Sequence, residues 1–117
     1  NPSWSSSQVM PKDLSRQKDI EQGIIKVAND VIDRLSRHHQ KAGRIRLGLG
    51  YANGVTDKNG RTSYSHEITI EPTAERKLLI DHLLGIFHQA WSGAAVRNIS
   101  VALSRLSDAN TQQISLF

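Results

Sequence analysis

Residues Val96 to Leu106 read VRNISVALSRL, and this stretch decides the fold. Apolar side chains at Ile99, Val101 and Leu103 alternate with small or polar ones, which is the period of a strand that buries one face. Such a strand belongs to a sheet that is covered on one side only. The polar run from Ser107 to Asn110 is typical of a turn, so we expect the strand to end before it.

Three further segments show strand character. A short strand is expected at Ser7 to Met10, where Pro11 should end the pairing. A second runs from Arg44 to Tyr51 in strict alternation, and a third covers Ser63 to Ile70. Asn-Gly pairs mark the connection between these two as a turn region. His66 has the apolar parity of the third strand and is interpreted as a core or edge histidine.

Two segments have the helical period instead. The first extends from about Arg16 to Gln40, with capping residues expected at Asp13 to Ser15 and a stop at Gly43. Its apolar stripe comprises Ile20, Ile24, Val27, Ala28, Val31 and Leu35. The second begins near Thr73, the expected cap, and ends at Trp91; its stripe comprises Leu79, Leu83, Ile86, Phe87 and Ala90.

The elements therefore follow the order strand, helix, strand, strand, helix, strand, which predicts an α+β domain. Two helices with one apolar stripe each must cover one face of a four-stranded sheet, and the other face is left to solvent or a partner. That open face is predicted to carry cationic, hydroxyl and amide groups that donate hydrogen bonds to phosphate without reading bases. Its members are Lys12, Arg44, Arg46, Ser63, Ser65, Asn98, Ser100 and Ser104, with Glu67 as the exception.

Composition sets limits on the possible functions. The 117 residues carry a net charge of +4, and five basic residues without an acidic one lie between Arg34 and Arg46. Such a block attracts polyanions, although a solvated helix end gives the same pattern. There is no cysteine and no apolar run near the ~20 residues of a membrane span. The first residue is Asn1, so we expect a piece of a longer protein.

Two chemical motifs are weighed and rejected. His38 and His39 are neighbours on a predicted helix and point about 100° apart, so they are poorly placed to share a metal ion. The glycines between Gly50 and Gly60 are not followed by a helix or by a Lys-Ser/Thr pair, as a phosphate-binding loop requires.

Four blocks of the sequence resemble the little-finger domain of Y-family DNA polymerases, in particular the UmuC-like (ImpB/MucB/SamB) bacterial branch. The resemblance covers essentially the whole chain. Trp4 and Ser5 depart from the family's usual Ile and Gly in the first block. The blocks are Ser3 to Asp13, Arg44 to Tyr51, Ser65 to Thr73 and Val96 to Leu106.

The resemblance implies a division into a linker (1–6), a DNA-binding domain (7–107) and a flexible tail (108–117). It implies a non-catalytic domain, with the catalytic carboxylates and Mg²⁺ in a palm outside this chain and no cofactor within it. The parent would be a cytoplasmic translesion DNA polymerase. The little finger would hold primer–template duplex by backbone contacts.

Some relatives carry arginine where this chain has Asn98 and Ala102. Arg44, Arg46, Arg97 and Arg105 are therefore expected to take a larger share of the grip. Because Arg97 and Arg105 have the buried parity, they would act from the ends of the last strand.

The C-terminal residues QISLF resemble the peptide by which bacterial polymerases bind the sliding clamp. By that resemblance Leu116 and Phe117 would fill an apolar pocket, and the amide of Gln113 would hydrogen-bond at a second one. The expected clamp-binding residues are Gln113, Ile114, Ser115, Leu116 and Phe117. A fraying terminus is the alternative.

Two other functions are considered. An RNA-recognition module has the same element order but needs aromatic residues on its central strands. Here Tyr64 alone lies near that position, and aromatic residues make up 5% of the chain. The second alternative is a protein-interaction domain, whose open face would bind another protein.

Overall fold

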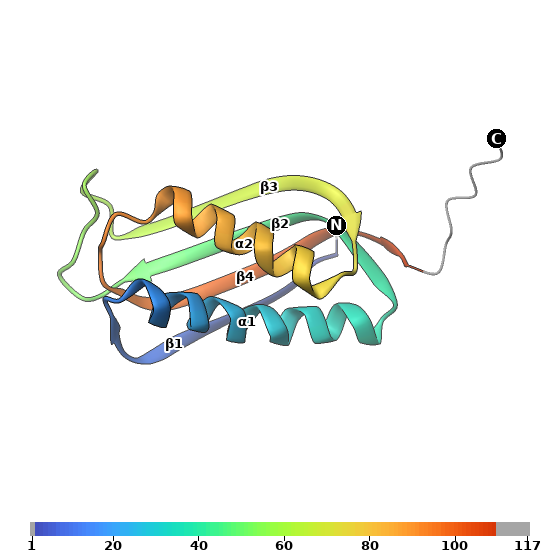
Figure 1. The fold of residues 1–117 in the computed structure, drawn as a ribbon, viewed down its shortest axis with the longest axis horizontal. Coiled ribbons are helices and arrows are strands. Elements are labelled where there is room, and N and C mark those ends of the chain that lie inside the picture. The colour runs from blue at the N-terminus through green and yellow to red at the C-terminus, as the bar shows by residue number, and fades with distance from the viewer. Residues whose placement is uncertain (1, 110–117) are drawn as a thin grey trace.

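The computed structural model describes residues 2–109, which form four strands and two helices (Figure 1). In chain order these are β1 (Trp4–Leu14), α1 (Gln17–Arg37), β2 (Gln40–Tyr51), β3 (Ser63–Thr73), α2 (Arg76–Ala90) and β4 (Val96–Asp108). The predicted order of elements and the α+β class are confirmed.

The strands make one sheet in the order β1-β4-β2-β3, and each neighbouring pair is antiparallel. β4 and β2 are therefore central, while β1 and β3 form the edges. Both helices lie on the same side of this sheet, as Figure 1 shows. The opposite side carries no element of the described chain.

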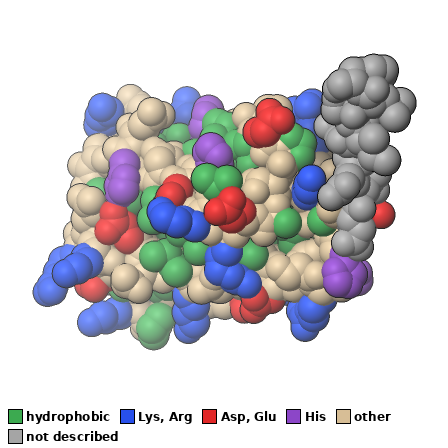
Figure 2. Space-filling model, turned by 45° about the vertical axis from the view of Figure 1, so that its right-hand side comes forward, with side chains coloured by type: hydrophobic (Ala, Val, Ile, Leu, Met, Phe, Trp, Pro, Cys, Tyr) green, Lys and Arg blue, Asp and Glu red, His purple; other side chains and the backbone are tan. Residues whose placement is uncertain are grey.

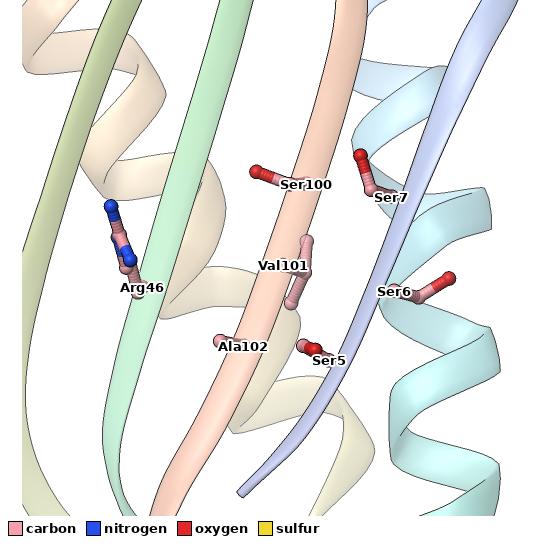
Figure 3. Close-up of a pocket in the computed structure, with 7 residues that line it drawn as sticks. All are labelled: Ser5, Ser6, Ser7, Arg46, Ser100, Val101 and Ala102. Atoms are coloured by element: carbon pink, nitrogen blue, oxygen red, sulfur yellow. The ribbon is translucent and has the colours of Figure 1, made fainter.

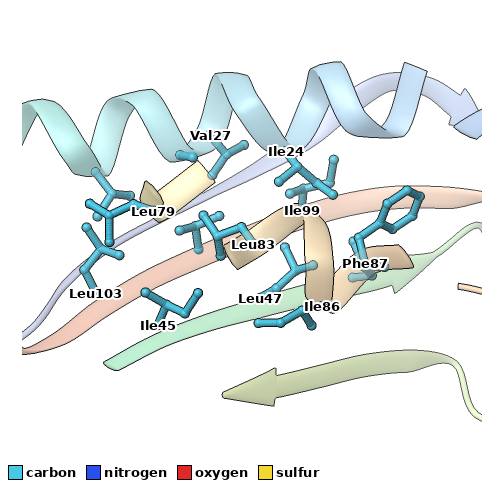
Figure 4. Close-up of a cluster of buried hydrophobic side chains, with 14 of the residues drawn as sticks. Ile24, Val27, Ile45, Leu47, Leu79, Leu83, Ile86, Phe87, Ile99 and Leu103 are labelled. Carbon is cyan, nitrogen blue, oxygen red and sulfur yellow. The ribbon is translucent and has the colours of Figure 1, made fainter. Parts of the chain in front are cut away.

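The core lies between the helices and the sheet (Figure 4). The predicted stripes account for it, since Ile24 and Leu83 from the helices and Leu47 and Ile99 from the central strands are fully buried. α1 comes close to β4 at Gly23, where an added Cβ would lie 2.7 Å from Ile99 Cδ1. α1 can approach β4 this closely because residue 23 has no side chain.

The sheet extends further than the sequence indicated at both ends of the chain. Trp4 to Ser6, predicted as linker, begin β1, and they pair with Val101 to Leu103. The indole of Trp4 stacks on His38 at 4.6 Å and donates to Gln40 Oε1 at 2.7 Å, which fixes the start of β1.

β4 also continues through the predicted turn. Ser107 and Asp108 pair with Lys41 and Gln40 of β2, so polar residues remain in the strand because the ladder continues. Pro11 interrupts the pairing but does not end it as predicted, since regular partners stop at Val9 and resume at Leu14, and β1 runs beyond Met10.

The predicted helix ends require correction. α1 is preceded by Arg16, which makes no side-chain cap, so the expected caps at Asp13 to Ser15 are wrong. The helix ends at Arg37 because His39 adopts a left-handed backbone with φ of 53°. Gly43 lies inside β2 instead of stopping the helix.

At the second helix, Thr73 is not the N-cap. Its Oγ1 accepts a hydrogen bond from the Glu75 N–H at 3.0 Å, and Glu75 itself is the residue that precedes the first helical turn. β3 ends at Thr73 and α2 begins at Arg76, and this local hydroxyl–backbone bond lies in the short connection between them.

Candidate nucleic-acid interface

The pairing register places side chains from all four strands on the face without helices. Residues directly opposite one another in antiparallel strands point to the same side. Three cross-strand rows are Val9–Asn98–Gly50–Ser63, Ser7–Ser100–Gly48–Ser65 and Ser5–Ala102–Arg46–Glu67; a fourth contains Ser104, Arg44 and Thr69. We call these residues the open face. It brings together seven of the predicted contact residues: Arg44, Arg46, Ser63, Ser65, Asn98, Ser100 and Ser104.

Two glycines of β2, Gly48 and Gly50, lie at the centre of this face and leave room for side chains of β4. A Cβ at Gly48 would lie 2.3 Å from Ser100 Oγ, and one at Gly50 would lie 3.0 Å from Asn98 Cβ. The side chains of Ser100 and Asn98 therefore occupy space that any other residue in β2 would fill. Both glycines also line a hollow of about 240 Å³ together with Ser65, so part of the β2 backbone is open to a ligand there.

The charge of the open face is positive at one end. Arg46 is exposed and donates to Ser65 Oγ at 3.2 Å, and the guanidinium of Arg44 makes no side-chain hydrogen bond or ion pair within residues 2–109. Glu67, opposite Arg46, is the one acidic residue in the four rows. On the face drawn in Figure 2, by comparison, basic and acidic side chains are interspersed.

A hollow of about 330 Å³ lies on the open face between β1, β4 and β2 (Figure 3). Arg46 stands on one side of it, Ser100 and Ala102 line it from β4, and Ser5 and Ser7 come from β1. The sequence prediction missed Ser5 and Ser7. Three consecutive serines, Ser5 to Ser7, show no alternation of apolar and polar residues. The remaining signal for a strand here was that Trp4 and Met10 lie an even number of positions apart and so share one face.

Three predicted contact residues lie elsewhere. Arg97 has the helix-side parity, and its guanidinium donates to Asp13 Oδ1 at 3.0 Å, so it already has an acidic partner. Arg105 is exposed with a left-handed φ of 51°, opposite Gly43. Lys12 is exposed in the unpaired part of β1, where no register assigns it to a face.

The remaining candidates have structural surroundings. His38 stacks on Trp4, while His66 is exposed on the edge strand β3, with its ring 6.4 Å from that of Tyr64. Across residues 2–109, no three His, Asp or Glu side chains come together to hold a metal ion. No helix in the same range has the length and apolarity to cross a membrane. The predicted clamp-binding residues, Gln113 to Phe117, lie outside the described residues.

A solved structure with the same architecture defines the class of domain. The chain superimposes with a TM-score of 0.65 on a chain of the complex of the beta-clamp processivity factor and the little finger domain of PolIV. The match covers 88% of this chain and 87% of that one, at 14% sequence identity. The similarity establishes the fold, which is that of a little-finger domain.

Sequence similarity then gives the family. Residues 1–116 match the impB/mucB/samB family C-terminal domain, and the chain belongs to this family. It is also 33% identical over 116 residues to the "Putative UV-damage repair protein UvrX" of Bacillus subtilis (strain 168). The match covers 98% of this chain but spans about 27% of the length of that relative. The suspected resemblance to the little finger of UmuC-like, Y-family proteins is thereby confirmed.

Proposed function

We propose that this chain is the DNA-binding, non-catalytic domain of a cytoplasmic translesion DNA polymerase. It grips primer–template duplex through phosphate contacts made by the open face. Nucleotide transfer and the Mg²⁺ ions it needs belong to a palm in the remainder of the parent protein. The observation that carries the proposal is the open face itself, where the register collects arginine, serine and asparagine donors around Gly48 and Gly50.

The chemistry of these groups favours backbone contact over base reading. Arginine, hydroxyl and amide groups donate to phosphate oxygens, and these contacts fix a duplex without sequence information. None of the residues in the four rows is aromatic, so there is no platform for unstacked bases. This argues against the RNA-recognition alternative. Holding the duplex without reading its bases suits an enzyme that accepts damaged template.

The C-terminal tail is proposed to bind the sliding clamp. Its sequence supports this through Gln113, Leu116 and Phe117, and the structural neighbour is a little finger in complex with a clamp. A five-residue peptide offers few contacts and should bind weakly alone, with a Kd on the order of micromolar. Simultaneous binding of the open face to DNA would raise the effective affinity.

The first test is the double variant Arg44→Ala/Arg46→Ala. Removing two phosphate contacts should weaken duplex binding for every sequence alike and reduce the slope of log K against log salt by about 2. Fluorescence anisotropy with two unrelated duplexes over a salt series measures both quantities.

A matched control is Lys18→Ala/Lys26→Ala, which removes the same charge from exposed positions of α1. It should retain the wild-type slope more closely, since these side chains lie on the helix side. If the arginine variant folds normally and binds duplex as before, the proposal is wrong. Absence of any duplex binding by the wild type would favour the protein-interaction alternative.

A further inference from the structure

A second hollow of about 350 Å³ lies at the edge of the sheet, away from the open face. It is enclosed by the β2–β3 loop, the beginning of β3 and the end of α2. Its lining residues are Asp57, Lys58, Asn59, Arg61, Tyr64, His66, Gln89, Ala90 and Ser92. In the register, Tyr64 and His66 lie opposite Leu49 and Leu47, so they face the helix side.

We infer that this edge pocket receives one unstacked nucleotide of a single-stranded segment that leaves the duplex held on the open face. The inference rests on the proposed function, because it assumes a nucleic acid on that face. A nucleotide needs a surface for its base, a cation for its phosphate and polar groups for the base edge. The pocket has all three.

The surface for the base is the ring pair of Tyr64 and His66. Their centroids are 6.4 Å apart with an interplanar angle of 27°, and His66 is exposed. A base can stack on such rings whatever its identity, because every base has a π-face. Burial raises the pKa of the Tyr64 hydroxyl, so this ring stays a neutral phenol near pH 7.

The cations for the phosphate are Lys58 and Arg61 on the β2–β3 loop. Asp57 is the one acidic lining residue, and its Oδ1 accepts hydrogen bonds from the backbone N–H groups of Asn59 and Arg61. The carboxylate thus shapes the turn that carries the two cations. The C-terminal end of α2 has a partial negative charge, so the phosphate should lie at the loop and the base edge beside Gln89.

The open face and the pocket meet at Tyr64 of β3. Tyr64 lines this pocket and also a hollow on the open face, which includes Gly48 and Asn98. Within the described chain β3 pairs with β2 alone, so no strand covers its outer edge. A single-stranded nucleic acid that leaves the open face can therefore pass around the outer edge of β3 into the pocket.

The test compares binding of a blunt duplex with that of the same duplex carrying a single-stranded oligothymidine overhang. Wild type should bind the overhang duplex at least about fivefold more tightly. This factor is the lower limit of the affinity gained when one base stacks on an aromatic side chain. Lys58→Gln/Arg61→Gln and His66→Ala should each remove this advantage while leaving blunt-duplex binding unchanged. Lys18→Gln/Lys26→Gln, which removes the same charge from α1, should keep it.

The outcomes separate this inference from the proposed function. The inference is overturned if blunt duplex binds but the overhang gives no advantage, or if the advantage survives in the pocket variants. Arg44→Ala/Arg46→Ala should weaken both duplexes, and failure of that result counts against the open face instead. Circular dichroism of each variant confirms that the fold is retained.

Discussion

Gly23 and Gly85 both lie inside helices, but the space around them differs. At Gly23 a Cβ would meet Ile99 Cδ1 at 2.7 Å and Met10 Sδ at 3.3 Å, whereas at Gly85 nothing lies within 4 Å. Ile99 is fully buried, so it has little freedom to move away. The same residue type therefore has a packing role in α1 and none in α2.

We expect opposite effects from the same substitution at these positions. Gly85→Ala should stabilise the domain by about 1 kcal/mol through helix propensity. Gly23→Ala gains the same helix propensity, but the added methyl group overpacks the core, which costs about 1–3 kcal/mol. The net change in the free energy of unfolding should therefore lie between zero and a loss of about 2 kcal/mol. Urea unfolding of both variants checks this. Equal stabilisation in the two would contradict the close approach of α1 to β4.

At the scale of elements, the two helices are joined by polar contacts at both ends. Arg76 of α2 donates to Asn29 and Asp33 of α1, each at 2.7 Å. At the other end His88 contacts the Glu21 carboxylate. This hydrogen bond, and a second from Gln17, hold the pKa of Glu21 below its ordinary value of 4.5.

The contact at Glu21 gives stability a pH dependence. The unfolded chain binds a proton at Glu21 more readily than the folded one, so the stabilisation is complete above about pH 4.5 and is lost as the pH falls through the lower, folded-state pKa. Between pH 6 and pH 3, Glu21→Gln should lose less stability than wild type. Denaturant unfolding over this range measures the difference, and parallel curves would show that the contact has no such role.

At the scale of the whole molecule, the open face and the tail are separate parts. The face is assembled from four strands that are distant in sequence, while Gln113 to Phe117 follow the last residue of β4. If each part binds its own partner, the two activities can be removed independently.

Deletion of Gln113 to Phe117 should abolish binding to the sliding clamp and leave duplex affinity unchanged. Surface plasmon resonance on immobilised clamp, with anisotropy on duplex DNA, measures the two activities in one preparation. Leu116→Ala/Phe117→Ala is a smaller change that should reproduce the clamp defect. Loss of both activities together would contradict the division of labour.

Local patterns in the chain determined the element order, both helical stripes and the parity of β2 and β4. They did so because burying one face of a strand or helix imposes a period that can be read without neighbours. From that parity, Arg44, Arg46, Asn98 and Ser100 could be assigned to one face in advance.

The tertiary structure alone decided the rest. Ser5 and Ser7 join the open face, and polar Ser107 and Asp108 stay in a strand, because pairing partners override weak local preference. Arg97 forms an ion pair with Asp13, and this pair exists because β1 lies beside β4 in the sheet. The edge pocket unites a loop, a strand and a helix end, and no local period encodes a contact between segments so far apart in sequence.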